Sequence, residues 1–221
     1  MGIYLDSAVI SEIKEFIELP FVEGVTTNPT LIAKALGRDT ITWAEFEAHI
    51  KQIGELVDGD IFVQTNHKDA KGMVEDGKKI HAVLGTKAVI KIPATSEGLK
   101  AISELADNDI RTAATAVFTG VQAYLAMLSG ADFVIPYYSR VQKAANDGLD
   151  LVEDILDIIE SQEMESQLLV ASIKNNFDVL EIIRAGAHAI TIPADIIKEL
   201  LAHHQTEDAQ AAFNKSLTVK G

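Results

Sequence analysis

Short β-branched segments alternate with longer amphipathic segments along the whole chain, and this alternation limits the possible folds more than any other feature. The segments with the length and composition of strands are 3–6, 24–26, 60–64, 87–92, 111–116, 133–136, 167–171 and 189–192. The segments with helical apolar spacing are 11–19, 43–56, 69–84, 97–106, 121–129, 150–161, 177–185 and 195–202. Strands that alternate with helices pair in parallel through crossover connections, so we expect an α/β protein.

Eight strand–helix units divide the 221 residues into about 28 residues each, close to the length of one such repeat. We therefore expect a single (β/α)8 TIM barrel over residues 1–221. The alternative is a doubly wound open sheet, but the glycine-rich and Walker-type loops of its nucleotide-binding forms are missing from the sequence. One further helix is predicted over 207–215, within a C-terminal helical extension at 203–221, packed on its own barrel or on a neighbouring subunit.

The chain carries 33 acidic and 19 basic side chains, a formal net charge of −14. Such a field repels phosphate backbones and anionic lipids, so we expect neither nucleic acid nor a membrane as a partner. The lack of cysteine excludes disulfides, thiolate nucleophiles and cysteine-ligated metals. Six histidines occur without metal-motif spacing, so no metal ion is expected. Neither a secretory signal nor an apolar run of roughly 20 residues is present, and a cytoplasmic location is expected.

Polar side chains stand where nearly every predicted strand ends. In a (β/α)8 barrel the active site is built at these carboxyl ends. The residues found there are Asp6, Thr26, Asn28, Gln64, Lys91, Thr115, Tyr137, Arg140, Ser172, Lys174 and Thr191. A ring that combines Lys, Asp, Tyr and Arg exceeds what solubility requires, so we expect it to carry chemistry.

Lys91 is the central residue of this ring. It lies in the alternating sequence KAVIKIP (87–93), and a parallel barrel strand is covered on both faces. Lysine is rarely buried without a reason, and desolvation lowers the pKa of an amine toward a neutral, nucleophilic form. The alternatives are an ammonium that reaches the barrel mouth or one that pairs with Asp6. Lys87, at the other end of the strand, is expected to be solvated.

The other strand ends leave two interpretations open. Asp6 either caps a following helix or faces the buried amine, and Asn28, before a proline, either caps a helix or binds a ligand. Arg140 is expected on a loop, while Ser172 and Lys174 precede a helix whose N-terminus favours an anion. These three residues either hold a phosphate group together or are an unrelated surface arginine and a serine cap.

Six short motifs in this order resemble one known family. They are YLD (4–6), GVTTNP (24–29), VIKIPATSEGL (89–99), TAVF (115–118), PYYSR (136–140) and ASIK (171–174). Over nearly its whole length the chain resembles the small transaldolase family, and most closely its fructose-6-phosphate aldolase branch.

The resemblance implies class I aldolase chemistry, in which a lysine forms a Schiff base with a ketone and no cofactor is needed. The catalytic residues it implies are Lys91, Asp6, Tyr137, Gln64 and Thr115, the last three of these holding a catalytic water. The substrate-binding residues it implies are Asn28, Thr26, Arg140, Ser172 and Lys174, with Arg140 and Ser172 on the phosphate. The implied partners are sugar phosphates and dihydroxyacetone, and the implied assembly is a homo-oligomeric ring, a pentamer or decamer.

Two positions separate the branches of the family. Transaldolases usually carry Glu where this chain has Gln64 and Phe where it has Tyr137, so the resemblance favours an aldolase that cleaves fructose 6-phosphate into dihydroxyacetone and glyceraldehyde 3-phosphate. The first alternative is a transaldolase that passes the dihydroxyacetone unit to erythrose 4-phosphate. The second is a catalytically silent barrel that binds a sugar phosphate. Departures at Ser7, Tyr138 and Ser139 leave the acceptor open.

Overall fold

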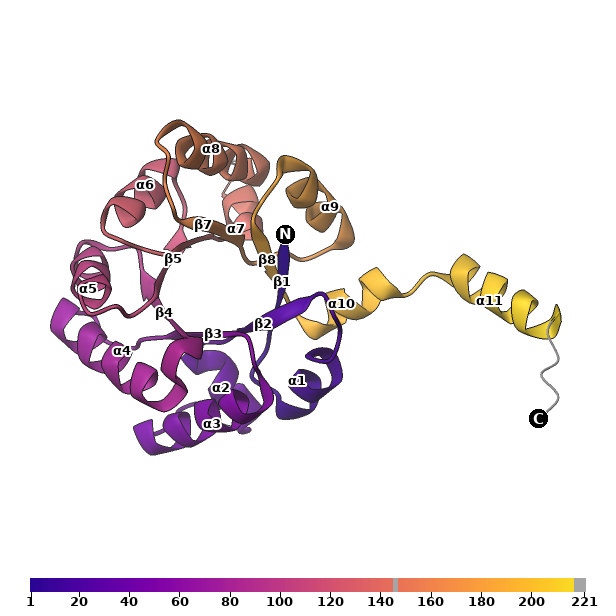
Figure 1. Ribbon diagram of the computed structural model, residues 1–221, viewed down its shortest axis with the longest axis horizontal. Helices are drawn as coiled ribbons and strands as arrows, with labels where there is room; N and C mark the ends of the chain where they lie inside the picture. Colours follow the sequence, from indigo (N-terminus) through magenta and orange to yellow (C-terminus); the bar gives the residue numbers. More distant parts are fainter. Residues whose placement is uncertain (145–146, 217–221) are drawn as a thin grey trace.

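Eight parallel strands close into a barrel in chain order in the computed structural model, which describes residues 1–144 and 147–216 (Figure 1). The strands are β1 (Gly2–Asp6), β2 (Val22–Thr26), β3 (Asp60–Gln64), β4 (Ala88–Pro93), β5 (Thr112–Val117), β6 (Phe133–Pro136), β7 (Gln167–Val170) and β8 (Ala189–Ile192). Pairing of β1 with both β2 and β8 completes the ring. The predicted (β/α)8 fold is confirmed.

Helices surround the barrel on its outer face, except for the last described helix, which extends away from it (Figure 1). They are α1 (Ile10–Phe16), α2 (Pro29–Ala35), α3 (Trp43–Leu56), α4 (Ala70–Leu84), α5 (Ser96–Ala106), α6 (Gly120–Leu128), α7 (Tyr138–Lys143), α8 (Gly148–Ser161), α9 (Asn176–Ala185), α10 (Ala194–Leu201) and α11 (His204–Ser216). Their apolar faces and the outward-facing strand residues form one large buried cluster. The helices therefore cover the sheet on the side away from the barrel axis.

The inside of the barrel is filled by a second, smaller buried cluster. The ring of Phe62 meets the edges of Tyr4 and Phe133 at centroid distances of 5.0 and 4.9 Å. Phe62 and Val89 belong to this cluster and lie two residues before Gln64 and Lys91 on their strands. Since side chains alternate along a strand, this apolar layer lies beneath the polar ring at the carboxyl ends.

Two short helices differ from the sequence-based prediction. Neither is among the helical segments predicted from the sequence, although a cap at Asn28 implies a helix after it: α2 spans seven residues there, and α7 spans six residues where we expect Arg140 on a loop. Six or seven residues span about two turns, so an apolar period within them is weak; α1 is as short as α2, but the pattern that predicts it continues over 11–19. Arg140 therefore lies on a helix, which corrects the prediction.

Lys87 also differs from its prediction. It lies in the short 3₁₀ turn η1 (Gly85–Lys87), and its Nζ donates to the carbonyl oxygens of Gly54 and Val57 at 3.2 and 2.7 Å. Asp58 lies 3.6 Å from the same nitrogen. The expected solvated side chain is instead bound to the end of α3, because its ammonium satisfies carbonyl groups that the helix leaves unpaired.

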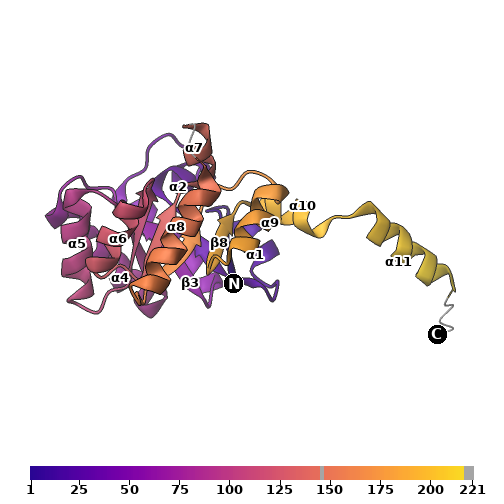
Figure 2. The same ribbon diagram turned by 90° about the horizontal axis from the view of Figure 1, so that it is seen from above.

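The C-terminal part of the described chain extends away from the barrel as α11 (Figures 1 and 2). This helix contains the predicted segment 207–215, which is thereby confirmed as helical, and none of its described residues is buried. Of the two predicted alternatives, packing on its own barrel is not observed among the described residues, and packing on a neighbouring subunit stays a prediction. Residues 217–221 of the predicted extension lie outside the described residues. Among the helices of the described chain, none combines the length and hydrophobicity needed to cross a bilayer.

Candidate active site

The carboxyl ends of the strands bring most of the predicted site residues to one end of the barrel. Asp6 is the register partner of Thr26, and Gln64 is the register partner of Lys91. In Figure 2, α7, which follows β6, lies at the upper end of the barrel and the N-terminus lies at the lower end. The polar ring thus lies at the open, upper end of the barrel, above the apolar interior.

Lys91 occupies a buried position on β4, with only 6% of its surface exposed. Its Nζ donates to the carbonyl oxygen of Thr27 at 3.1 Å, and within the described residues this is the one hydrogen bond of the amine. Burial lowers the pKa of Lys91 below its ordinary value, and the negative charge of Asp6 opposes this in part. Within the described residues no ion pair within 4 Å joins the two side chains. The amine is neither solvated nor salt-bridged, so a neutral form is accessible.

Asp6 takes part in a chain of side-chain hydrogen bonds across three strands. The Thr26 hydroxyl donates to Asp6 Oδ1 at 2.9 Å and lies 2.6 Å from the Thr191 hydroxyl. Because Thr26 donates its single proton to the carboxylate, Thr191 donates to Thr26. The capping interpretation of Asp6 is wrong, since the residue before the first turn of α1 is Val9.

Tyr137 and Thr115 form a second polar group on the other side of the ring. Thr115 Oγ1 donates to the Tyr137 phenol at 3.2 Å. The register between β5 and β6 shifts between Thr115 and Val117, and Ala116 between them has φ of 56°. This bulge lets Thr115 face the barrel while Val117 packs into the outer cluster. Such strain is uncommon for alanine and is often found at functional sites.

Arg140 lies beside Tyr137, with its guanidinium carbon 4.6 Å from the centre of the tyrosine ring. The helix that carries it is attached to the segment after β7. Tyr138 N donates to Ala171 O at 3.0 Å, and Ser139 N donates to Ser172 O at 3.2 Å. These bonds bring Arg140 and Ser172 into neighbouring segments, as the phosphate-binding interpretation requires.

Ser172 is not a helix cap. It has φ of 63°, and α9 is capped instead by Asn175, whose Oδ1 accepts from Asp178 N at 2.9 Å. The serine-cap alternative is therefore wrong, while Lys174 is an exposed neighbour in the same loop. The buried Tyr138 phenol donates to Glu181 Oε2 of α9 at 3.2 Å and fixes α7 from its other side.

A hollow of about 340 Å3 opens above the ring. Its lining includes Asn28, Gln64, Tyr137, Arg140 and Asn66, together with Pro29, Thr30 and Leu31. The capping interpretation of Asn28 is correct, because its Oδ1 accepts from Leu31 N at 3.0 Å. Its NH2 group remains a donor for a ligand, so the two interpretations do not exclude each other. The volume fits a small molecule, since such sites measure about 300–1,000 Å3.

Asn66 is one of the lining residues that sequence reasoning missed, and it lies on a different loop from the other three, Pro29, Thr30 and Leu31. It follows Gln64 by two residues in the loop between β3 and α4. The available signal was the run of polar residues after this strand end, but most such residues are simply solvated. Only the fold shows that this one borders the hollow.

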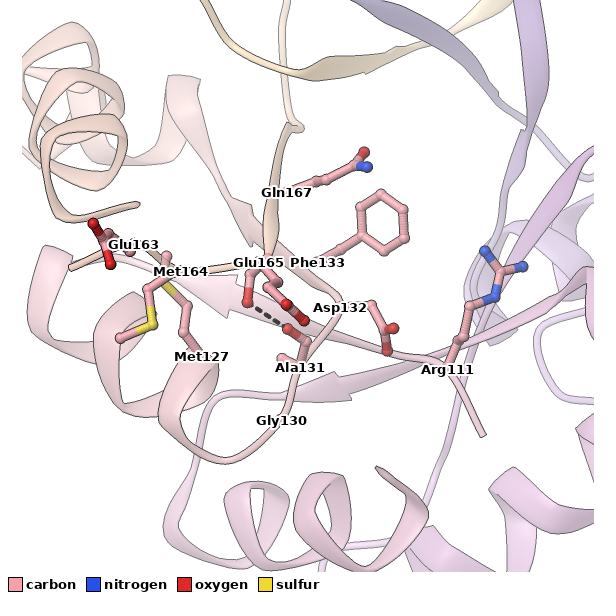
Figure 3. A pocket seen from close by; sticks show the side chains of 11 residues that line it. Arg111, Met127, Gly130, Ala131, Asp132, Phe133, Glu163, Met164, Glu165 and Gln167 are labelled. Carbon is pink, nitrogen blue, oxygen red and sulfur yellow. Dashed lines mark hydrogen bonds between the residues drawn. The ribbon is translucent and has the colours of Figure 1, made fainter. Parts of the chain in front are cut away.

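A larger hollow, about 580 Å3, lies at the opposite end of the barrel, against the amino ends of β5, β6 and β7 (Figure 3). Arg111 and Asp132 border it, and Arg111 binds Asp60 through two contacts of 2.5 and 3.1 Å. None of the predicted site residues lines this hollow. Barrel enzymes work at the other end, so its size does not make it the active site. In residues 1–144 and 147–216 no group of three or more metal-binding side chains is found.

Comparison with known proteins gives one consistent result. The family model described as "Transaldolase/Fructose-6-phosphate aldolase" matches residues 3–220. Similar curated proteins include a "Probable transaldolase" of Thermoplasma volcanium, 44% identical over 96% of this chain and 93% of that protein. The protein of the same description from Chlorobium chlorochromatii is 39% identical over 99% of both chains, and the one from Clostridioides difficile is 40% identical over 97% of this chain and 96% of that protein.

Solved structures agree at the level of the fold. A putative phosphonomutase from Burkholderia cenocepacia J2315 superposes with a TM-score of 0.63 at 13% identity, over 96% of this chain and 93% of that one. A 2,3-dimethylmalate lyase gives a TM-score of 0.62 at 12% identity, over 97% and 80%. At such low identity these similarities support the barrel architecture only.

Proposed function

The chain belongs to the transaldolase/fructose-6-phosphate aldolase family, and from this premise we propose that it carries a dihydroxyacetone unit as a Schiff base on Lys91. The resemblance drawn from the sequence motifs is confirmed at the level of the family. The observation that most directly supports the proposal is the buried amine of Lys91, whose pKa is lowered by burial. An amine that is neutral near pH 7 is the nucleophile that Schiff-base formation needs.

The reaction follows from the chemistry of this amine. Neutral Lys91 Nζ attacks the ketone carbon C2 of the sugar, and loss of water leaves an iminium ion. The C4 hydroxyl then loses its proton, the C3–C4 bond breaks toward the iminium, and an aldehyde departs while an enamine remains on the lysine. We assign the proton transfer to a water held by Tyr137, Thr115 and Gln64, because general acid–base catalysis needs a group within hydrogen-bond reach.

The remaining residues bind the two halves of the sugar. We assign Asp6, Thr26 and Asn28 to the hydroxyl groups of the dihydroxyacetone half. Thr26 and Asn28 flank Thr27, whose carbonyl accepts from Lys91, and Asp6 is hydrogen-bonded to Thr26. Together the three side chains offer both donors and acceptors. Arg140 and Ser172 are assigned to the phosphate, with the exposed charge of Lys174 nearby. A few cations held at one site can attract a phosphate dianion against the net charge of −14.

Two fates of the enamine define two candidate activities. We propose transfer to an aldehyde acceptor such as erythrose 4-phosphate as the main activity, because similar proteins at 39–44% identity are described as probable transaldolases. Protonation and release of dihydroxyacetone, the fructose-6-phosphate aldolase reaction, is the second candidate. Gln64 and the hydrogen-bonded pair of Tyr137 and Thr115 favour it, since they could hold the water that protonates the enamine.

A product assay separates the two activities. The protein is incubated with fructose 6-phosphate alone and with added erythrose 4-phosphate, and free dihydroxyacetone and sedoheptulose 7-phosphate are measured. Transfer predicts a seven-carbon product and little free dihydroxyacetone, whereas release predicts dihydroxyacetone without any acceptor. No product under either condition would contradict both candidates.

We also propose a homo-oligomer in which α11 contacts another copy of the chain. The support is that α11 projects from the barrel in both views and that Phe213 is 71% exposed (Figures 1 and 2). Analytical ultracentrifugation of the full chain and of Phe213→Ser tests this. A full chain that sediments as a monomer would contradict it.

A further inference from the structure

Three hollows meet at one polar side chain at the barrel mouth. Besides the hollow above the ring, two others of about 340 and 270 Å3 lie along α2 and α3. Pro29 and Asn66 are the two residues that line all three. Proline offers no side-chain hydrogen bond, so Asn66 is the polar group at the junction.

Asn66 lies just beyond the carboxyl end of β3, on the side toward which a bound substrate would extend. Gln64 is the register partner of Lys91, and Asn66 lies two residues further from the barrel interior. A sugar attached to Lys91 through C2 keeps its first three carbons next to the lysine. Its aldehyde half must therefore extend outward into the hollow that Gln64 and Asn66 line together.

A buried carboxylate fixes the backbone at Asn66. Asp76 of α4 is 3% exposed, and its Oδ2 accepts from Asn66 N at 3.2 Å. Its Oδ1 lies 3.6 Å from His67 Nε2. Burying a carboxylate is costly unless it is hydrogen-bonded. That a buried carboxylate binds the backbone of this loop indicates that the loop conformation matters. The reaction proposed above gives Asp76 no direct part.

We infer that the Asn66 side-chain amide binds the hydroxyl group next to the aldehyde carbon of the acceptor, and that Asp76 is the positioning residue that holds it there. This rests on the proposed function. An amide both donates and accepts, as a sugar hydroxyl does. An anion is a poorer ligand at this point, because the buried Asp76 carboxylate lies directly behind the loop, whereas Arg140 lies on α7. The ligand class is therefore a 2-hydroxyaldehyde.

The test removes the hydroxyl from the substrate and the amide from the protein in turn. With fructose 6-phosphate as donor, kcat/KM is measured for erythrose 4-phosphate and for its 2-deoxy analogue. We expect the wild type to prefer the hydroxylated acceptor by about ten-fold, the effect of one good hydrogen bond. In Asn66→Ala the preference falls to about two-fold or less. Asn108→Ala, which removes an exposed amide at the end of α5, keeps the wild-type preference.

The role of Asp76 is tested through the same ratio of kcat/KM for erythrose 4-phosphate to kcat/KM for its 2-deoxy analogue. Asp76→Ala is expected to lose the preference, and Asp76→Asn, which keeps an oxygen for the Asn66 N–H group, is expected to retain most of it. If Asp76→Ala does not fold, the acceptor preference of Asn66→Ala alone tests the inference.

An Asn66→Ala protein with the wild-type preference, or one that loses activity equally with both acceptors, would overturn the inference. Borohydride trapping of dihydroxyacetone on Lys91 is run in parallel on the wild type. Trapping with an unchanged preference refutes the role of Asn66 alone, whereas no trapping refutes the proposed function itself.

Discussion

Replacing Tyr138 by phenylalanine tests whether α7 positions Arg140, the arginine that we propose binds the phosphate. The Tyr138 phenol is 1% exposed and donates to Glu181 Oε2 at 3.2 Å, which joins α7 to α9. Burial, and then the Glu181 carboxylate, raise the pKa of Tyr138 above its usual range, so the hydroxyl stays a donor at neutral pH. The substitution removes that donor and leaves the ring and its packing in place.

The expected magnitude follows from this single bond. A hydrogen bond to a charged group contributes about 1.5–3 kcal/mol, but the exposed Glu181 carboxylate regains water when it is lost. We therefore expect a loss of about 1 kcal/mol, which corresponds to a factor of about five. The loss should appear as a higher KM for fructose 6-phosphate, because a displaced α7 moves Arg140 away from the phosphate.

The assay compares phosphorylated and unphosphorylated substrates. KM for fructose 6-phosphate should rise about five-fold in Tyr138→Phe, while the dihydroxyacetone concentration that half-saturates borohydride trapping should change less than about two-fold. Tyr124→Phe removes a phenol from α6, outside the site, and should change neither value. Equal weakening of both substrates would show a general loss of structure, and an unchanged KM for fructose 6-phosphate would refute the positioning argument.

Three further changes have defined outcomes. In the product assay, Tyr137→Phe should lower the release of dihydroxyacetone without an acceptor by about ten-fold or more, and it should lower transfer less. An equal loss of release and transfer would contradict the assigned water site. Near pH 7, Lys91→Met should unfold at a higher urea concentration than the wild type. Between the lowered pKa of Lys91 and about 10.4, the unfolded wild type binds more protons than the folded form, so the wild type gains stability as pH rises through that range. The difference between the two urea midpoints should therefore narrow with rising pH, and a widening difference would refute the burial argument. Gly98→Ala should cost about 1–3 kcal/mol of stability in chemical denaturation, because its methyl would overlap the Pro93 carbonyl. Gly120→Ala meets only side-chain atoms of Ile158 and Asp154 and should cost less; equal costs would count against this reasoning.

The repeated strands and helices were predictable because each strand is apolar on both faces and each long helix shows a regular apolar spacing. The burial of Lys91 was also predictable, since alternation places it on the face of Val89, which packs inside the barrel. The short helices α2 and α7 were not predictable, because the apolar period within their seven and six residues is weak, whereas the pattern that predicts α1 continues beyond that helix to residue 19. The bulge at Ala116 depends on pairing with β6, which the local sequence does not reveal.

Part of the site depends on contacts between distant segments. Asn66 borders the hollow because Asp76, ten residues away on α4, holds its backbone. Ser172 adopts a left-handed backbone conformation, which the local sequence does not predict, and its carbonyl accepts a hydrogen bond from the backbone of α7. The residues themselves were visible in the sequence, but their neighbours were set by tertiary structure.

The central claim is that the Lys91 amine captures a ketone. Dihydroxyacetone and borohydride are added to the wild type and to Lys91→Met, and the digested proteins are analysed by mass spectrometry. We expect a reduced three-carbon adduct on the wild-type peptide that contains Lys91, and no adduct anywhere in Lys91→Met. An unmodified Lys91 peptide, or an adduct on another lysine that persists in Lys91→Met, would contradict it.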